Sequence, residues 1–291
     1  MTALVAGWFS FESMGATAGD LVARDVVCGW LDEAGVPFDV AAVPPFDGDV
    51  DWRAADPARY SHVVFVCGPV GNGWPLTELL DRFRESSFLA VNVSLLDPLA
   101  RWNPFSAVFA RDGDEQSWPD VSFLSPIPAS PVVGLVLVHA QREYADAAHD
   151  LVGDAVARLV AATNVTAVPI DTRLDVTASG LTTPAQVESL IARMDAVVTT
   201  RLHGLVLALK NGVPALAIDP IRGGAKVKQQ AATIDWPVCF TPDALDSEEL
   251  ERALAWCLTA EARAAARDSA TRARALLEEL PARFKAAVGA Q

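Results

Sequence analysis

The segment that decides the fold is DAVVTTRLHGLVLALKNGVPALAID, which occupies residues 195–219. Its first apolar run, AVVTT, has the length and the β-branched side chains of a buried strand. A helix is expected to begin within the next few residues and to close near Gly212, because glycine suits the left-handed position that follows a helix. The run PALAID then predicts another strand. A strand, a helix and a second strand in succession indicate a parallel sheet with helices on its faces.

The same alternation extends over the whole chain. In the first half, Pro75 is well placed to open a helix at LTELLDRFRES. The segment SPIPASP, residues 125–131, holds three prolines and is typical of a domain linker. The alternation restarts after it, and the tail from Ser247 is rich in helix-forming residues. The strands are predicted at ALVAGWF (3–9), PFDVAAV (37–43), HVVFVCG (62–68), FLAVNVSLL (88–96), VVGLVLVHA (132–140), VTAVPID (165–171), AVVTT (196–200) and PALAID (214–219).

We therefore predict an α/β protein of two Rossmann-like domains. The chain has 291 residues, which exceeds the usual size of a single hydrophobic core. The linker places the boundary between an N-terminal domain of residues 1–127 and a C-terminal domain of residues 128–291. Two such domains are expected to face each other across a cleft at the carboxyl ends of their strands, which is where open parallel sheets bind ligands.

Composition and charge argue against several classes of function. Hydrophobic residues make up 51% of the chain and charged residues 21%, as in an ordinary folded protein. The net charge of −14 would repel a phosphate backbone, so no nucleic-acid partner is expected. The N-terminus lacks the basic start of a signal peptide, and no apolar run reaches the roughly 18 residues of a membrane span. A cytoplasmic location without an integral membrane segment is therefore expected.

No metal, disulfide or cofactor is predicted. The cysteines Cys28, Cys67, Cys239 and Cys257 are widely spaced without a C-x-x-C pair, and buried free thiols are expected. No group of histidines and carboxylates has the spacing of metal ligands. The Gly-rich segment GPVGNGWP, residues 68–75, lacks the spacing of the dinucleotide-binding motif and lies after the third predicted strand rather than the first.

Arg201 and His203 interrupt the apolar segment at its strand-to-helix turn. The free N–H groups and the positive end of the new helix lie at the same carboxyl edge of the sheet. Together with a guanidinium they form a site suited to phosphate or carboxylate, and Gly204 would let a ligand approach the backbone closely. The residue types alone leave a second interpretation open, in which Arg201 is a solvated rim residue and His203 a structural polar group.

The segment RMDAVVTTRLHGLVLALKNGVPALAID, followed by Lys226, resembles the signature of the polysaccharide pyruvyl transferase family. Members of that family carry an Arg-Leu-His-Gly or Arg-Leu-His-Ala turn, a Gly-Val-Pro and then a lysine. AVFARDGDEQSWPDVSFLSP is similar to the family's Val-x-Arg-Asp strand before the linker. VGLVLVHAQRE is similar to the strand that begins the second domain, where Arg142 would take the place of the family's arginine.

The first domain resembles the family less closely. GPVGNGWP lies where the family has a Gly-Gly-Gly loop, and the N-terminal GWFSFESMGATAGD follows the family's Gly-x-Asn-x-Gly-Asp pattern only loosely. Ser13 stands where asparagine is usual, and Asp20 is displaced.

The resemblance implies a fold similar to the GT-B glycosyltransferases. It implies an enzyme that transfers the pyruvyl group of phosphoenolpyruvate onto two hydroxyls of a sugar, in a polysaccharide or glycoconjugate such as those of cell-wall biosynthesis. The product is a ketal with a free carboxylate, and phosphate is released. Arg201 would clamp phosphate or carboxylate, and His203 would be the general acid or base. Thr200, Gly204 and Arg142 would also contact phosphoenolpyruvate, with Lys226 or the nearby Arg222 as a second cation in the C-terminal domain.

The N-terminal domain would then bind the acceptor sugar. Asn72 and Gly73 in the Gly-rich loop, and Glu12 and Ser13 in the N-terminal loop, are the expected substrate-binding residues. Trp8 and Trp74 border predicted strand ends, and aromatic faces commonly stack on sugar rings.

Two other functions stay open at this stage. The first is a nucleotide-sugar glycosyltransferase of GT-B type, in which Arg201 would hold a diphosphate. The second is a non-catalytic relative that retains the anion-binding turn but has lost chemistry from the first domain.

Overall fold

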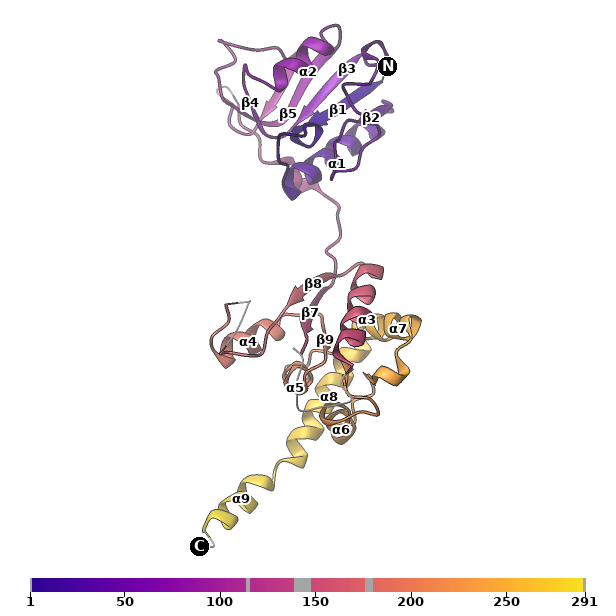
Figure 1. The fold of residues 1–291 in the computed structure, drawn as a ribbon. Coiled ribbons are helices and arrows are strands. Elements are labelled where there is room, and N and C mark those ends of the chain that lie inside the picture. Colours follow the sequence, from indigo (N-terminus) through magenta and orange to yellow (C-terminus); the bar gives the residue numbers. More distant parts are fainter. Residues whose placement is uncertain (1, 114–115, 139–147, 176–179, 290–291) are drawn as a thin grey trace. The chain divides into compact units, whose positions relative to one another are not determined.

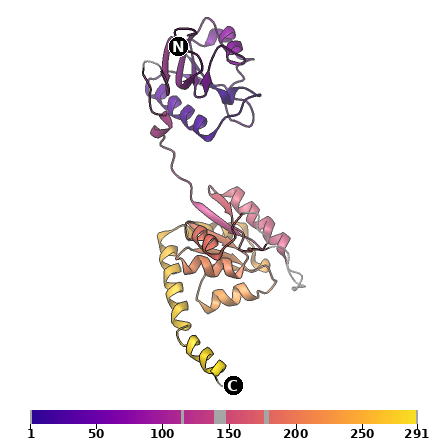
Figure 2. The same cartoon turned by 90° about the vertical axis from the view of Figure 1, so that its left-hand side faces the viewer.

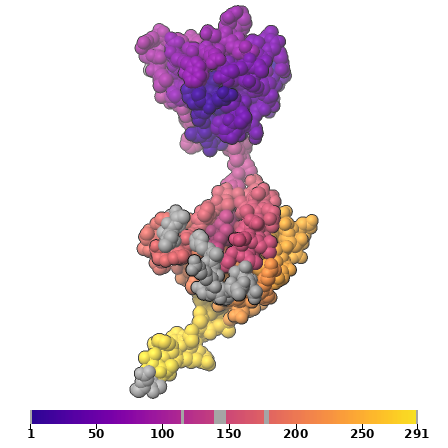
Figure 3. Space-filling model, viewed as in Figure 1, coloured from indigo at the N-terminus to yellow at the C-terminus, as the bar shows by residue number. Residues whose placement is uncertain are grey.

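The computed structural model describes residues 2–113, 116–138, 148–175 and 180–289. The chain divides into two compact units, Met1–Pro128 and Ala129–Gln291 (Figure 3). Each unit has its own parallel sheet with helices on its faces, which confirms two α/β domains (Figure 1). The expected cleft concerns the relative placement of the units and stays a prediction. Among the described helices, none has the length and apolar character needed to cross a bilayer.

Unit 1 has the strand order β2-β1-β3-β5-β4, and β6 pairs with β5. All pairs are parallel, and β1 lies between β2 and β3. The elements are β1 (Ala3–Gly7), α1 (Ala18–Glu33), β2 (Phe38–Val40), β3 (His62–Val66), β4 (Pro69–Val70), α2 (Leu76–Arg82), β5 (Ser87–Leu95) and β6 (Ala107–Ala110).

The apolar strands of unit 1 bury residues on both faces of the sheet. One face carries Phe65 and Leu79 among its buried side chains, and the other carries Val27 and Val66. The predicted strand at residues 3–9 is shorter in the structure, because Trp8–Ser10 turns into a short 3-10 helix. Removing these buried side chains from water is the main stabilising contribution to the fold.

Unit 2 has the strand order β11-β10-β9-β7-β8, again wholly parallel. Helices pack against this sheet, and the C-terminal helix α9 extends beyond the rest of the unit (Figure 2). The predicted strand at 132–140 is also shorter and ends at Val136. The elements are β7 (Val132–Val136), α3 (His149–Ala162), β8 (Thr166–Pro169), α4 (Pro184–Ile191), β9 (Ala196–Thr199), α5 (Leu202–Lys210), β10 (Ala215–Ile218), α6 (Lys226–Thr233), β11 (Cys239–Phe240), α7 (Ser247–Cys257), α8 (Ala260–Leu276) and α9 (Leu280–Gly289).

In each sheet the chain adds one strand on one side of its first strand and then crosses to the other side. The candidate sites lie at these two switch points. In unit 1 the chain adds β2 on one side of β1 and β3 on the other. In unit 2 it adds β8 on one side of β7 and β9 on the other. Connections on opposite faces separate at such a point, which leaves a crevice at the carboxyl ends of the strands.

The four cysteines are free thiols, with Cys67 and Cys257 buried and Cys28 and Cys239 half-buried. Burial raises the pKa of Cys28, Cys67 and Cys239 to about 11 and that of Cys257 to about 12. The thiols therefore stay protonated at neutral pH.

Candidate functional site

Arg201 lies where the carboxyl ends of three neighbouring strands meet. It is the N-cap residue of α5 and directly follows β9 and Thr200. Because β7 lies between β8 and β9, the residues that follow these strands come together at one edge of the sheet. This edge is also the point at which the growth of the sheet reverses. Arg201 therefore occupies the position that open α/β sheets use for ligands.

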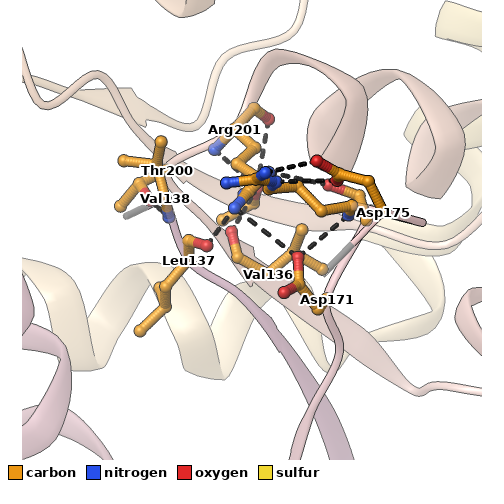
Figure 4. A network of polar contacts seen from close by, with 10 residues as sticks. Val136, Leu137, Val138, Asp171, Asp175, Thr200 and Arg201 are labelled. Carbon is orange, nitrogen blue, oxygen red and sulfur yellow. Dashed lines mark hydrogen bonds and ion pairs between the residues drawn. The ribbon is translucent and has the colours of Figure 1, made fainter. Parts of the chain in front are cut away.

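The guanidinium of Arg201 is held by the ends of two strands (Figure 4). Its Nε donates to the carbonyl of Leu137, at 2.8 Å, and an Nη donates to Oγ1 of Thr172, at 3.3 Å. Asp171 forms an ion pair with the other Nη at 3.5 Å, and both side chains are only 14% exposed. Burial lowers the pKa of Arg201, and the charge of Asp171 opposes this. Arg201 is therefore a fixed, half-buried cation and not a solvated rim residue.

Two threonines build the turn that precedes α5. Oγ1 of Thr199 accepts from the N–H of Arg201, at 3.0 Å, and donates to the carbonyl of Val136, at 3.0 Å. Oγ1 of Thr200 accepts from the N–H of Val138, at 2.7 Å. Thr200 is buried, and its hydroxyl joins the ends of β7 and β9. The predicted role of Thr200 as a direct substrate contact stays a prediction, whereas its structural contact is clear.

The N-terminus of α5 carries unused backbone donors. No side chain caps this helix, and within the described residues the N–H groups of Leu202, His203 and Gly204 have no acceptor. The side chain of His203 is exposed on this first turn. The helix N-terminus and Arg201 thus lie at the same strand end, and His203 follows on the first turn of the helix.

Gly204 has a different structural reason from the one predicted. A Cβ at this position would lie 2.1 Å from Oγ1 of Thr199 and 2.8 Å from Val136. Glycine is therefore needed so that α5 can pack closely on β7 and β9. Its absent side chain faces the sheet, so it does not provide clearance for a ligand.

The next turn, between β10 and α6, is built around a buried carboxylate. Asp219 is 1% exposed, and its Oδ2 accepts N–H groups of Ala225, Val227 and Lys228 at 2.7–3.0 Å. Its Oδ1 accepts from the N–H of Ile221 at 3.1 Å. The backbone donors at this helix start are thus occupied by the protein itself.

Both predicted cations of this turn are at the surface. Lys226 is exposed at the first position of α6. Arg222 forms an exposed ion pair with Asp243 at 3.1 Å. Arg142 lies outside the described residues.

The predicted residues of unit 1 gather at the carboxyl edge of its sheet. Asn72 and Gly73 line a pocket of about 530 Å³, which Trp8, Trp74 and Asp97 also line. Glu12 and Ser13 are exposed in the loop that continues into the pocket through Met14 and Gly15.

Trp8 is fixed beneath this edge. Its ring packs against Phe65 and Phe11, with ring centroids 5.8 Å and 5.7 Å apart. A side chain at Gly68, where φ is +77°, would overlap the indole. The indole N–H is buried and has no acceptor in the described part of the chain, and Gly68 covers it.

Sequence reasoning missed Asp171, Asp219 and Asp97. Each follows the last residues of a strand, which was a usable signal. No group of three or more metal-ligating side chains occurs among the described residues.

Comparison with known proteins bears on this segment. Residues 145–221 match the model of the polysaccharide pyruvyl transferase family. The resemblance drawn from the Arg-Leu-His turn is thereby confirmed for the segment that holds Asp171, Thr200, Arg201, His203 and Gly204. A search of curated proteins finds no match.

The solved structures that match this chain are distant in sequence. The glycotransferase of kitacinnamycin is 12% identical over 96% of this chain and 97% of its own, with a TM-score of 0.32. UDP-GlcNAc 2-epimerase from Methanocaldococcus jannaschii is 9% identical over 95% and 99%, with a TM-score of 0.33. MurG of Acinetobacter baumannii is 11% identical over 93% and 94%, with a TM-score of 0.34. These values do not bear on the substrates of this protein.

Proposed function

We propose that the protein transfers the pyruvyl group of phosphoenolpyruvate onto two hydroxyls of a sugar in a polysaccharide or glycoconjugate. The observation that carries this proposal is the turn between β9 and α5. There a fixed guanidinium and three backbone N–H groups that have no acceptor among the described residues lie at one strand end, with the exposed His203 on the same helical turn, within the family match. Phosphoenolpyruvate is a small, multiply charged anion, and such a turn can bind it in an otherwise acidic protein.

Arg201 retains donor capacity for this anion. Its ion pair with Asp171, at 3.5 Å, is longer than an ordinary hydrogen bond. The Nη of that pair can therefore donate to a phosphate or carboxylate oxygen. Leu137 and Thr172 hold the other side of the guanidinium, so that little conformational entropy is lost when the anion binds.

The chemistry assigns His203 a proton-transfer role. The first sugar hydroxyl adds across the C2–C3 double bond of phosphoenolpyruvate. Its oxygen bonds to C2, its proton is lost to a base, and C3 gains a proton in exchange and becomes a methyl group. The second hydroxyl then forms a bond to C2 as the C2–O bond to phosphate breaks, and its proton leaves with phosphate. His203 delivers the proton to C3 or to the leaving phosphate, which is general acid catalysis. Arg201 stabilises the charge that develops on phosphate.

Phosphate release from phosphoenolpyruvate tests the proposal, with p-nitrophenyl glycosides of galactose, glucose and mannose as acceptors. We expect release that depends on an acceptor. His203→Gln should lower turnover by about 10²–10⁴-fold, because a general acid is lost, while phosphoenolpyruvate still binds. His62→Gln is the control. His62 is the first residue of β3, so it lies at the amino ends of the strands of the unit 1 sheet and away from their carboxyl ends.

Two results would count against this function, and a third would count against the role of His203. Binding without release under every acceptor would favour the non-catalytic relative. Binding of a nucleotide sugar in place of phosphoenolpyruvate would favour the glycosyltransferase. Equal losses in His203→Gln and His62→Gln would remove the role of His203.

A further inference from the structure

The pocket of unit 1 combines an open aromatic face with two polar side chains. Trp74 is 62% exposed, although tryptophan in a folded domain is usually largely covered. Asn72 is exposed in the same loop, and Asp97, which follows β5, lines the same pocket. Since β3 and β5 are neighbours in the sheet, these residues meet at its carboxyl edge.

The carboxylate of Asp97 is held but not covered. It forms an ion pair with Arg101 at 3.3 Å, and its side chain is 27% exposed, whereas that of Arg101 is 79% exposed. An ion pair with so exposed a partner is weak, so the carboxylate can still accept hydrogen bonds from a ligand.

Gly73 gives a second, independent observation. Its φ is not in the left-handed region, and a Cβ built on it would meet no atom within 4 Å. Neither backbone conformation nor packing in unit 1 therefore requires glycine here. In contrast, Gly68 and Gly71, in the same loop, lie against Trp8 and Leu96. A glycine with open space that lines a pocket provides clearance for a bound molecule.

We propose that this pocket binds one neutral hexopyranose ring. The apolar face of the ring would lie on the indole of Trp74, and two of its hydroxyls would pair with the Asn72 amide and the Asp97 carboxylate. The residues that line the pocket include Asp97 but no lysine or arginine, and Arg101, which pairs with Asp97, is largely in solvent. A carboxylate that is screened only by so exposed a partner favours a neutral sugar over a uronic acid or a sugar phosphate. That the ring is the acceptor rests on the proposed function, whereas its binding does not require phosphoenolpyruvate.

Fluorine NMR of the full chain labelled with 5-fluorotryptophan tests this assignment. Trp74→Phe identifies the Trp74 resonance, and Trp118, which is exposed on unit 1 and does not line this pocket, is the control. The probes are the methyl glycosides of galactose, glucose and mannose, with methyl glucuronide as the charged comparison. We expect at least one neutral glycoside to shift the Trp74 resonance saturably, and methyl glucuronide to bind about tenfold more weakly.

Two variants sharpen the test. Asp97→Asn should bring the affinities for the neutral glycoside and for methyl glucuronide closer together, because the carboxylate that repels the glucuronide is gone. Gly73→Val should weaken the binding of the neutral glycoside about tenfold and leave the unfolding midpoint of the protein nearly unchanged. No shift of Trp74 with any neutral glycoside, an equal shift of Trp118, or equal binding of the glucuronide by the wild type would each overturn the assignment.

Thermal unfolding with phosphoenolpyruvate on the same protein separates the two proposals. A glycoside shift without stabilisation by phosphoenolpyruvate would retain the sugar pocket and reject the donor. Stabilisation by phosphoenolpyruvate without any glycoside shift would reject the sugar pocket and retain the donor.

Discussion

The turns that follow β9 and β10 differ in what occupies the start of the helix. Both lie at the carboxyl edge of one sheet, and both begin a helix of similar length. At α5 the first backbone N–H groups have no acceptor within the described chain, and Arg201 adds a positive charge. At α6 the carboxylate of Asp219 accepts these donors.

The difference shows that a helix start at a strand end is not by itself an anion site. A carboxylate from the protein satisfies the same backbone donors as a phosphate, and it does so at a fixed position. At α6 a carboxylate of the protein thus occupies the backbone donors, whereas at α5 the corresponding donors are available to a ligand. If Lys226 binds phosphoenolpyruvate, it does so through its ammonium group and not with the amides of α6.

Removing the carboxylate that closes α6 should have the largest effect. Asp219→Ala leaves one buried and three part-buried N–H groups without acceptors, and we expect it to destabilise unit 2 by about 3–4 kcal/mol. Chemical denaturation measures this loss. Asp235→Asn is the control, because that carboxylate is 88% exposed, its ion pair with Arg272 should contribute less than about 1 kcal/mol, and asparagine tolerates the left-handed backbone at φ +54°. Equal losses in the two variants would show that Asp219 does not organise the turn.

Filling the contact between α5 and the sheet should have the next largest effect. Gly204→Ala forces a methyl group against Thr199 and Val136, and we expect a loss of about 2–3 kcal/mol from overpacking. Gly153→Ala is a matched helical control, because its Cβ would meet no atom within 4 Å. It should stabilise α3 by about 0.5–1 kcal/mol. The unfolding midpoint of each variant measures these effects. A change in the same direction for both substitutions would contradict the packing account.

The sequence predicted the position of the open turn but not the closed one. The apolar runs placed Arg201 and His203 at a strand-to-helix turn, and Gly212, at φ +69°, follows α5 as expected. Asp219 was visible only as the last residue of a strand. Its contacts with Ala225 to Lys228 depend on how the intervening loop folds back, which periodicity does not determine.

The ion pair of Arg201 was hidden for a similar reason. Asp171 and Arg201 are thirty positions apart in the sequence, and they meet because β8 and β9 flank β7. Strand order is a tertiary property, so no local pattern could pair them. The role of Gly204 was misassigned because a glycine that admits a ligand and one that admits a neighbouring strand look the same in a sequence.

The carboxylate of Asp120 in unit 1 should make a smaller contribution to stability, and one that depends on pH. Arg111 follows β6 and pairs with Asp120 at 3.0 Å. Burial opposes ionisation of Asp120, but hydrogen bonds from Ser122 and Arg111 outweigh it and lower its pKa from 3.8 to about 2. The ionised carboxylate therefore stabilises the fold above about pH 4, and this contribution fades between about pH 4 and pH 2.

We expect Asp120→Asn to destabilise unit 1 by about 1–2 kcal/mol at pH 7, after allowance for solvent screening. The difference from the wild type should shrink as the pH falls towards 2, which denaturation at a series of pH values measures. A difference that stays constant over that range would show that the ionisation of Asp120 is not its source.

The central claim is that the turn at α5 binds phosphoenolpyruvate through Arg201. The most direct measurement is the unfolding midpoint with and without phosphoenolpyruvate, for the wild type, Arg201→Ala and Arg222→Ala. Each variant serves as its own reference, so any loss of intrinsic stability cancels. At about a hundred times its dissociation constant the ligand should stabilise the wild type by about 2.7 kcal/mol. We predict that this gain persists in Arg222→Ala and disappears in Arg201→Ala; an equal gain in Arg201→Ala, or none in the wild type, would contradict the claim.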